Sequence, residues 1–105
     1  SKRTPEALTE LEAAARLAPE SARYGYVYAV ALNDTGRPKQ ATGVLLRVLA
    51  RHPNDRDTLF TLIAYSRAQG DSRQALGHAR RLAQLEPANP EVRQLVERLE
   101  AEARR

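Results

Sequence analysis

The sequence predicts an all-α chain built from repeated helix hairpins. Three observations support this prediction: a repeat of 34 residues, turn-forming residues that recur at its boundaries, and the absence of the alternation typical of amphipathic strands. Pro19, Pro53 and Pro87 lie 34 residues apart, and Gly36 and Gly70 show the same separation. Because helix hairpins repeated at a fixed step bury their faces against one another, we expect a short solenoid.

Two further sets of residues share the 34-residue step. One set consists of alanines, and the other of residues that can cap the N-terminus of a helix. The two sets are Ala7, Ala41 and Ala75, and Ser21, Asp55 and Asn89. Since four kinds of position keep one register, and each has a structural reason, the pattern indicates a real repeat.

These residues divide the chain into six predicted helices. The helices cover about residues 5–18, 22–34, 38–51, 56–69, 72–85 and 90–103. Pro5 suits the first turn of the first helix, where a missing N–H costs little. Gly36 and Gly70 follow the second and fourth helices, because glycine adopts the left-handed conformation that ends a helix. Asp71 and Asn89 are the expected caps of the fifth and sixth helices.

The short connections predict that consecutive helices are antiparallel. We therefore expect a single domain over residues 1–105. Its predicted parts are the second helix of a truncated repeat at 5–21, a repeat at 22–55, a repeat at 56–89 and a capping helix at 90–104.

Composition is that of a soluble globular chain, with 42% hydrophobic and 29% charged residues among 105. No apolar run approaches the ~20 residues that cross a bilayer, and the first five residues carry no apolar core of a signal peptide. The sequence holds no Met, so we expect it to be a piece of a longer protein whose targeting signal lies elsewhere. Its compartment is therefore unknown at this point.

The net charge of +4 comes mainly from arginines that are scattered along the chain, most of them near an acidic residue. Nucleic-acid binding needs a basic patch or stripe, so it is not expected.

The sequence shows no arrangement of residues expected for catalysis or metal binding. Cys is absent, and the two histidines, His52 and His78, have no partner at the spacing of a helical metal site. The glycines are isolated and form no phosphate-binding loop. We therefore expect no enzyme, no catalytic or metal-binding residue and no cofactor.

The pattern resembles the tetratricopeptide repeat, whose step is 34 residues and whose consensus is W-x2-L-G-x2-Y…A-x3-F…P. At these places, residues 22–55 carry Gly25, Tyr28, Ala29, Leu32, Ala41, Leu45 and Pro53. Residues 56–89 carry Leu59, Leu62, Ile63, Ser66, Ala75, Ala79 and Pro87. Ala7, Leu11, Ala14 and Pro19 fit the second helix of an earlier repeat.

The chain departs from the family pattern at three places. Gly25 stands where the consensus has Trp, Ile63 where it has Gly, and Ser66 where it has Tyr. Neighbouring Tyr24 and Tyr65 are the candidates to supply the lost volume.

The resemblance implies a right-handed solenoid whose concave groove binds a protein or peptide. It further resembles repeat modules near the C-termini of larger bacterial proteins. The predicted peptide-binding residues are Arg23, Tyr26, Val30, Asn33, Asp57, Phe60, Ala64, Arg67 and Gln94. Tyr26 and Phe60 would be aromatic anchors, or they pack between neighbouring hairpins; both alternatives remain open. Asn33 could hydrogen-bond a ligand backbone, and Arg67 could meet a carboxylate.

Some family members hold a C-terminal carboxylate with a Lys/Asn/Arg clamp. The matching places here hold Tyr26, Val30 and Phe60, so this type of recognition is disfavoured.

The leading functional hypothesis is a scaffold that binds another protein or a peptide segment, with no nucleic-acid or membrane partner. The alternative is a structural spacer or self-association element of a larger multidomain protein. The first predicted helix motivates the self-association alternative, since the helix that its apolar face should pair with is expected upstream of Ser1. Further repeats would cover this face in a longer protein, whereas in isolation it could form a homodimer. That face consists of Leu8, Leu11, Ala15 and Ala18.

Overall fold

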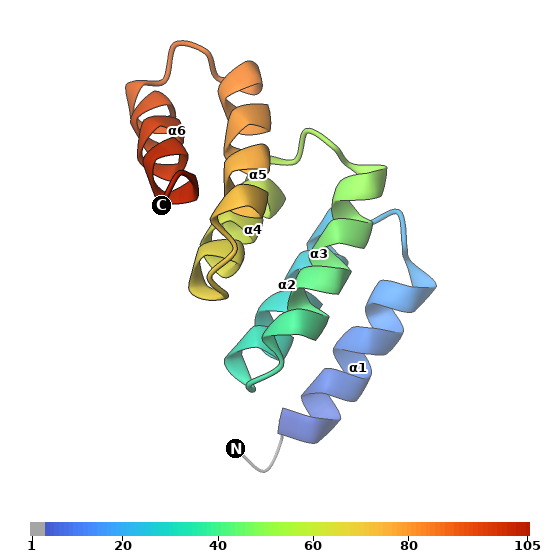
Figure 1. Ribbon diagram of the computed structural model, residues 1–105. Helices are drawn as coiled ribbons and strands as arrows, with labels where there is room; N and C mark the ends of the chain where they lie inside the picture. Colours follow the sequence, from blue (N-terminus) through green and yellow to red (C-terminus); the bar gives the residue numbers. More distant parts are fainter. Residues whose placement is uncertain (1–3) are drawn as a thin grey trace. The chain divides into compact units, whose positions relative to one another are not determined.

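The computed structural model describes residues 4–105, with side chains from Pro5 onward, and is all-α over this range (Figure 1). Its helices are α1 Thr4–Leu17, α2 Ala22–Asp34, α3 Pro38–Arg51, α4 Arg56–Ala68, α5 Ser72–Leu85 and α6 Pro90–Ala103. Residues 4–105 contain no strand. The sequence-based helix bounds agree with these to within one residue, so the predicted fold class is confirmed.

Capping side chains begin four of the helices as predicted. Each accepts a hydrogen bond from a backbone N–H two or three residues ahead, at 3.0–3.2 Å. The caps are Ser21, Asp55, Asp71 and Asn89. Such a bond satisfies one of the N–H groups that the first turn of a helix leaves without an intrahelical partner.

Glycine ends α2 and α4 in the same way. Gly36 has φ of 82° and Gly70 has φ of 77°, a conformation that other residues avoid. At the end of α2, the Arg37 N–H donates to the Leu32 carbonyl at 2.9 Å, and the Gly36 N–H donates to the Asn33 carbonyl at 3.1 Å. This Schellman arrangement satisfies the last carbonyls of the helix and turns the chain toward the next one.

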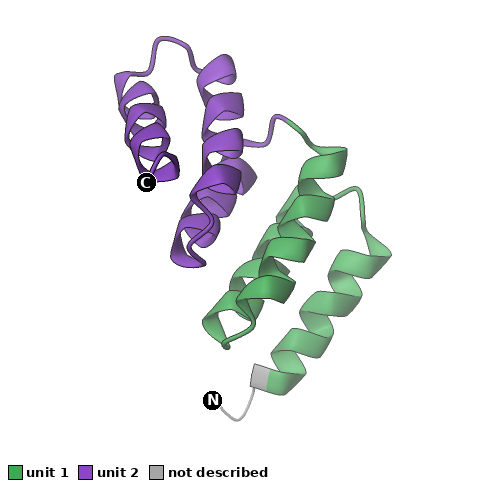
Figure 2. Cartoon of the chain, in the orientation of Figure 1, with its two compact units in different colours: residues 1–53 green, residues 54–105 purple. Residues whose placement is uncertain are grey.

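The chain forms two compact units, which Figure 2 colours separately. Unit 1 covers residues 1–53, and within it α2 packs against both α1 and α3. Unit 2 covers residues 54–105, and within it α5 packs against both α4 and α6. Each unit therefore contains one hairpin, α2–α3 or α4–α5, and one further helix. The grouping of both units into a single domain stays a prediction.

The core of unit 1 is formed by small and aliphatic side chains that face one another from α2 and α3. Ala29, Leu32, Ala41 and Leu45 are all at most 2% exposed. Leu8 of α1 is also buried, so the α1 face that was expected to lie open is partly covered within the chain. Among the large apolar side chains described in α1, Leu17 is exposed, at 80%.

The core of unit 2 is fully buried and lies mainly on α4, α5 and α6. Leu59, Leu62, Ala75, Ala79, Leu82 and Leu99 are 0% exposed. Ile63 and Ser66, two of the three departures from the repeat consensus, are buried too. The second hairpin thus accepts both departures inside its core.

Gly25, the third departure, lies against Val48 of α3. A Cβ atom built on Gly25 would lie 2.3 Å from Val48 Cγ2, so Val48 would have to shift to admit a side chain on Gly25 itself. Val48 therefore occupies part of the space that the consensus Trp would take. Tyr24, expected to supply the lost volume, is 49% exposed and does not do so.

Candidate peptide-binding site

Four of the predicted binding residues lie on α2 of unit 1. Arg23, Tyr26, Val30 and Asn33 recur every three or four residues, a spacing that aligns them along one side of a helix. Arg23 is exposed and the other three are half-buried. The buried residues Gly25, Ala29 and Leu32 occupy other positions of α2. Part of the Tyr26 side chain is therefore accessible on this side of α2.

The other five predicted residues lie in unit 2. Four of them occupy α4 with the same spacing, and Gln94 lies on α6. The structure brings Phe60 and Gln94 together, because both line a cavity of about 320 Å³ between α4 and α6. The remaining lining residues are Asn89, Glu91, Val92, Leu95 and Arg98. The exposed residues Asp57, Ala64 and Arg67 lie outside the cavity.

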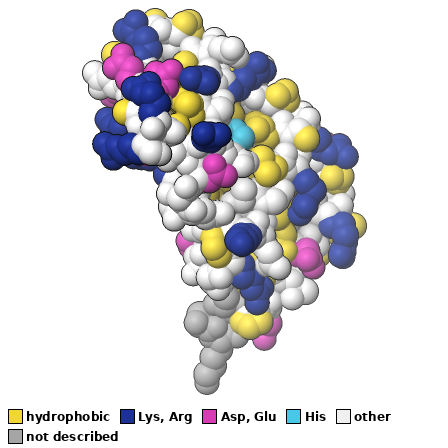
Figure 3. Space-filling view, viewed as in Figure 1, with side chains coloured by type: hydrophobic (Ala, Val, Ile, Leu, Met, Phe, Trp, Pro, Cys, Tyr) yellow, Lys and Arg dark blue, Asp and Glu magenta, His cyan; other side chains and the backbone are white. Residues whose placement is uncertain are grey.

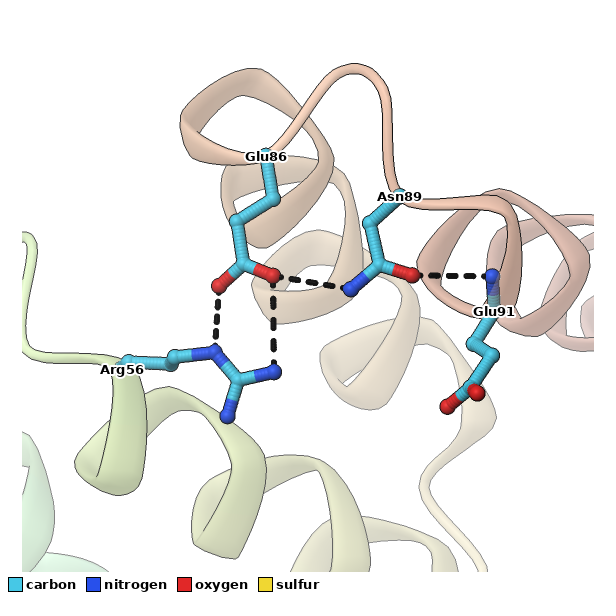
Figure 4. A network of polar contacts seen from close by, with 4 residues as sticks. All are labelled: Arg56, Glu86, Asn89 and Glu91. Atoms are coloured by element: carbon cyan, nitrogen blue, oxygen red, sulfur yellow. Dashed lines mark hydrogen bonds and ion pairs between the residues drawn. The ribbon is translucent and has the colours of Figure 1, made fainter.

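Arg56 covers one face of the Phe60 ring, a contact that the sequence analysis missed. Its guanidinium carbon lies 4.4 Å from the ring centroid, which is a cation–π contact. Figure 4 shows how Arg56 is held: its Nε donates to Glu86 Oε2, and its Nη2 donates to Glu86 Oε1 at 3.4 Å. The signal that could have found this contact is the four-residue separation of Arg56 and Phe60, one helical turn.

Glu86 links the Arg56 contact to the start of α6. Asn89 Nδ2 donates to Glu86 Oε1 at 2.9 Å, and Asn89 Oδ1 accepts from the Glu91 N–H at 3.0 Å (Figure 4). The bond from Arg56, followed by that from Asn89, lowers the pKa of the Glu86 carboxyl. The carboxylate therefore stays ionised at neutral pH. One series of hydrogen bonds through Glu86 connects Arg56, which covers the Phe60 ring, with Asn89, the cap of α6.

Arg67, expected to meet a ligand carboxylate, already contacts one inside unit 2. Its Nη2 donates to Glu102 Oε2 at 2.7 Å, and both side chains are partly exposed. The two residues are separated by 35 positions, so no local pattern in the sequence could reveal the pair. Because partly exposed ion pairs contribute little and are screened by salt, the pair can open for a ligand.

Possible metal ligands do not cluster in the part of the chain that the structure describes. No group of three or more His, Cys, Asp or Glu side chains within residues 4–105 is placed to hold a metal ion. His52 belongs to unit 1, where its Nε2 lies 2.6 Å from the Glu20 carbonyl. His78 belongs to unit 2, and burial lowers the pKa of its imidazole. The two histidines therefore have separate surroundings.

On the face that Figure 3 shows, the basic side chains lie in separate groups, with acidic side chains near several of them. Within residues 4–105 no helix combines the length and the apolar character of a membrane span.

Comparisons with known proteins agree with this architecture. A solved structure, the crystal structure of MamA protein, is similar with a TM-score of 0.79 and 17% sequence identity. The match covers 95% of this chain and 55% of the MamA chain, and at this identity it shows the fold alone. No curated protein matches the sequence. The family model for the tetratricopeptide repeat matches residues 1–64, more than half of the sequence. The chain therefore belongs to the tetratricopeptide repeat family.

Proposed function

We propose that the chain is a protein-binding module that holds a segment of a partner at the surface around Phe60. Proteins with this fold generally mediate protein–protein interactions. The observation that carries the proposal is the cavity between α4 and α6, in which Phe60 and Gln94 meet. Binding sites usually combine apolar side chains with a few convergent polar groups, and this cavity is lined by three apolar and four polar or charged residues.

The cavity offers one apolar wall and one polar rim. Phe60, Val92 and Leu95 would receive an apolar side chain of the partner, with the Phe60 ring fixed by the guanidinium of Arg56. The exposed side chains of Gln94 and Arg98 would bind the partner's backbone and a carboxylate. Because Tyr26 is the 34-residue equivalent of Phe60, the α2 face with Arg23, Val30 and Asn33 would provide further contacts.

An affinity pull-down from a bacterial lysate tests the proposal. The wild type is compared with the Tyr26→Ser/Phe60→Ser double variant and with a Leu46→Ser/Leu85→Ser control. The control also removes two apolar side chains, which are 38% and 37% exposed and lie outside the cavity. We expect a protein that the wild type and the control retain and the double variant loses. Equal retention by all three chains would contradict a site at these residues.

A second variant guards against loss of folding. Gln94 and Arg98 are exposed, so replacing both with Glu should leave the helices intact and make the cavity rim, which already holds Glu91, strongly acidic. We expect Gln94→Glu/Arg98→Glu to lose the same partner while keeping the wild-type circular dichroism spectrum. Retention of the partner by this folded variant would place the binding surface elsewhere.

Self-association is a second candidate function, which the exposure of one α1 side chain favours. Leu17 in the last turn of α1 is 80% exposed, the largest value among the large apolar side chains described. A homodimer formed through α1 would bury it. Sedimentation equilibrium should then give twice the monomer mass for the wild type and the monomer mass for Leu17→Glu. A wild-type monomer at high concentration would exclude this candidate.

A further inference from the structure

Unit 1 contains a second cavity, of about 440 Å³, which none of the predicted binding residues lines. It lies among α1, α2 and α3, and Gly25 forms part of its wall. The other lining residues are Glu12, Ala15, Arg16, Pro19, Ser21, Tyr28, Val44, Arg47, Val48 and Arg51.

The cavity lies where the repeat consensus has a large side chain and this chain has none. Gly25 occupies the place of the consensus Trp, and Val48 reaches in to fill only part of that space. In the other hairpin the equivalent residue is Leu59, which is 0% exposed and fills its own position. The apolar part of the lining, which includes half-buried Ala15 of α1 and buried Val44 of α3, therefore fits an aromatic ring supplied from outside.

The rim of this cavity is positively charged. Arg16 lies on α1, Arg47 and Arg51 lie on α3, and all three are exposed. None of them forms an ion pair with any other residue in the range 4–105. The rim carries three guanidinium groups against one carboxylate, that of Glu12.

Glu12 is moreover engaged by Tyr28. The Tyr28 hydroxyl donates to Glu12 Oε2 at 3.3 Å. Burial, followed by the neighbouring Glu12 charge, raises the pKa of Tyr28, so the phenol keeps its proton and remains a donor. The one acidic group at the rim is therefore partly satisfied, and the arginines dominate the charge that a ligand meets.

We propose that this cavity binds a tryptophan side chain presented by an acidic segment of a partner protein. The ring would take the room that the consensus Trp vacates, and carboxylates on both sides of it would pair with the arginines of α1 and α3. Three arginines spread over two helices match several carboxylates along a peptide better than the single carboxylate of a small aromatic acid. The inference rests on the proposed function in taking a protein as the partner, but it uses a different surface.

The experiment uses a peptide with one tryptophan and two acidic residues on each side, capped at both ends. The protein itself contains no Trp, so tryptophan fluorescence reports the peptide alone. We expect a blue shift as the ring enters the apolar cavity, and an affinity that falls as salt rises. Three comparison ligands are the same peptide with alanine in place of tryptophan, the same peptide with lysines in place of its acidic residues, and indole-3-acetate. The alanine peptide is followed through an attached dye.

Two variants and one matched control locate the site. Ala15→Phe fills the cavity, and Arg16→Gln/Arg47→Gln/Arg51→Gln removes the rim charge. Each should weaken binding of the acidic tryptophan peptide at least about tenfold. The control, Arg73→Gln/Arg93→Gln/Arg104→Gln, changes net charge equally at exposed positions outside both cavities, and should change the affinity less than about twofold. Circular dichroism checks that each variant remains helical.

Four results would overturn the inference. Two concern the protein: no blue shift with the wild type, or a control variant that weakens binding as much as the arginine variant does. Two concern the ligand: the alanine or lysine peptide binds as tightly as the acidic tryptophan peptide, or indole-3-acetate does. The last result would assign the cavity to a free aromatic acid. If Ala15→Phe does not fold, the arginine variant and the alanine peptide still decide the question. The Tyr26→Ser/Phe60→Ser variant should bind the peptide like the wild type, so failure here is distinguishable from failure of the site around Phe60.

Discussion

The hairpins α2–α3 and α4–α5 have the same helix lengths and the same positions of their caps and turns, but different side chains pack in their cores. Their helices have identical lengths, 13 and 14 residues, and both begin at an N-cap and turn at a left-handed glycine. At the place of the consensus Trp, however, the first hairpin has Gly25 and the second has Leu59. Leu59 is completely buried, whereas Gly25 borders an open cavity.

The comparison teaches that the turns and caps of the repeat are separable from the volumes packed between its helices. In the first hairpin a small residue on α2, Ala29, is combined with a large one on α3, Leu45. In the second the sizes are exchanged, with Ile63 on α4 and Ala79 on α5, and all four side chains are buried. Exchanges that keep the total volume are well tolerated. At Gly25 the exchange with Val48 is incomplete, and a cavity results.

The largest expected effect comes from making the second hairpin resemble the first. Leu59→Gly removes a fully buried side chain and adds the helix penalty of glycine, so it should lower the free energy of unfolding by about 4 kcal/mol. Urea denaturation followed by circular dichroism measures the loss. Leu46→Gly, at a position that is 38% exposed in the middle of α3, is the control and should cost about 1 kcal/mol. Losses of similar size for the two variants would refute the contrast between the hairpins.

The N-caps of α2 and α4, Ser21 and Asp55, also differ in the number of hydrogen bonds that they accept. Asp55 accepts from the Thr58 N–H at 3.1 Å and from the buried Thr58 hydroxyl at 2.6 Å, whereas Ser21 accepts only from the Tyr24 N–H among the described contacts. Asp55→Ala would also leave that hydroxyl without its acceptor. It should therefore cost about 2–3 kcal/mol, against about 1 kcal/mol for Ser21→Ala. The same denaturation experiment measures both, and a larger loss for Ser21→Ala would contradict this account.

The helix bounds, caps and turns were predictable from the sequence, because each depends on residues that are close together in the chain. Gly36 and Gly70 act through their own φ angles, and caps such as Asp71 act within three residues. The ion pairs of Arg56 with Glu86 and of Arg67 with Glu102 were not predictable, because their residues are 30 and 35 positions apart. Arg67, which the sequence analysis expected to bind a ligand carboxylate, forms an ion pair with Glu102 instead.

The filling of the core was predictable only in part. The place of the departure at Gly25 was visible in the repeat, but the residue that compensates for it was not. The expectation for Tyr24 was wrong because volume near Gly25 is supplied from the facing helix, by Val48. Of the candidate site, the meeting of Phe60 with Gln94 was anticipated through the family resemblance, whereas the cover by Arg56 was not.

The contact of Gly25 with Val48 gives a smaller effect whose sign can be reversed. Gly25→Ala should destabilise the chain by about 1 kcal/mol, because its Cβ would overlap Val48 Cγ2. In a Val48→Ala background the overlap is gone, so Gly25→Ala should stabilise by about 1 kcal/mol through helix propensity. A double-mutant cycle in urea measures the coupling. Additive effects of the two substitutions would show that Val48 does not fill the place of Gly25.

The smallest effect concerns His78, whose equivalent in the first hairpin is Val44. His78 Nε2 is buried without a hydrogen-bond partner in the described part of the chain, and burial lowers the pKa of the imidazole. The unfolded chain therefore binds a proton more readily, so this contribution to stability is present above about pH 6.5 and is lost as the pH falls below it.

Replacing the imidazole with the residue of the other hairpin isolates this contribution. His78→Val should raise the free energy of unfolding by about 1 kcal/mol at neutral pH and flatten its decline between about pH 6.5 and 5. Urea denaturation across this pH range compares variant and wild type. Parallel pH profiles would show that another group causes the decline.

The affinity of a captured partner for matched single variants tests the binding function most directly. Phe60→Ser and Leu85→Ser each remove one partly exposed apolar side chain from unit 2, inside and outside the cavity respectively. Isothermal titration should show at least about a tenfold rise in Kd for Phe60→Ser and no change for Leu85→Ser, with both variants folded. An unchanged Kd for Phe60→Ser would contradict the claim that this chain binds its partner around Phe60.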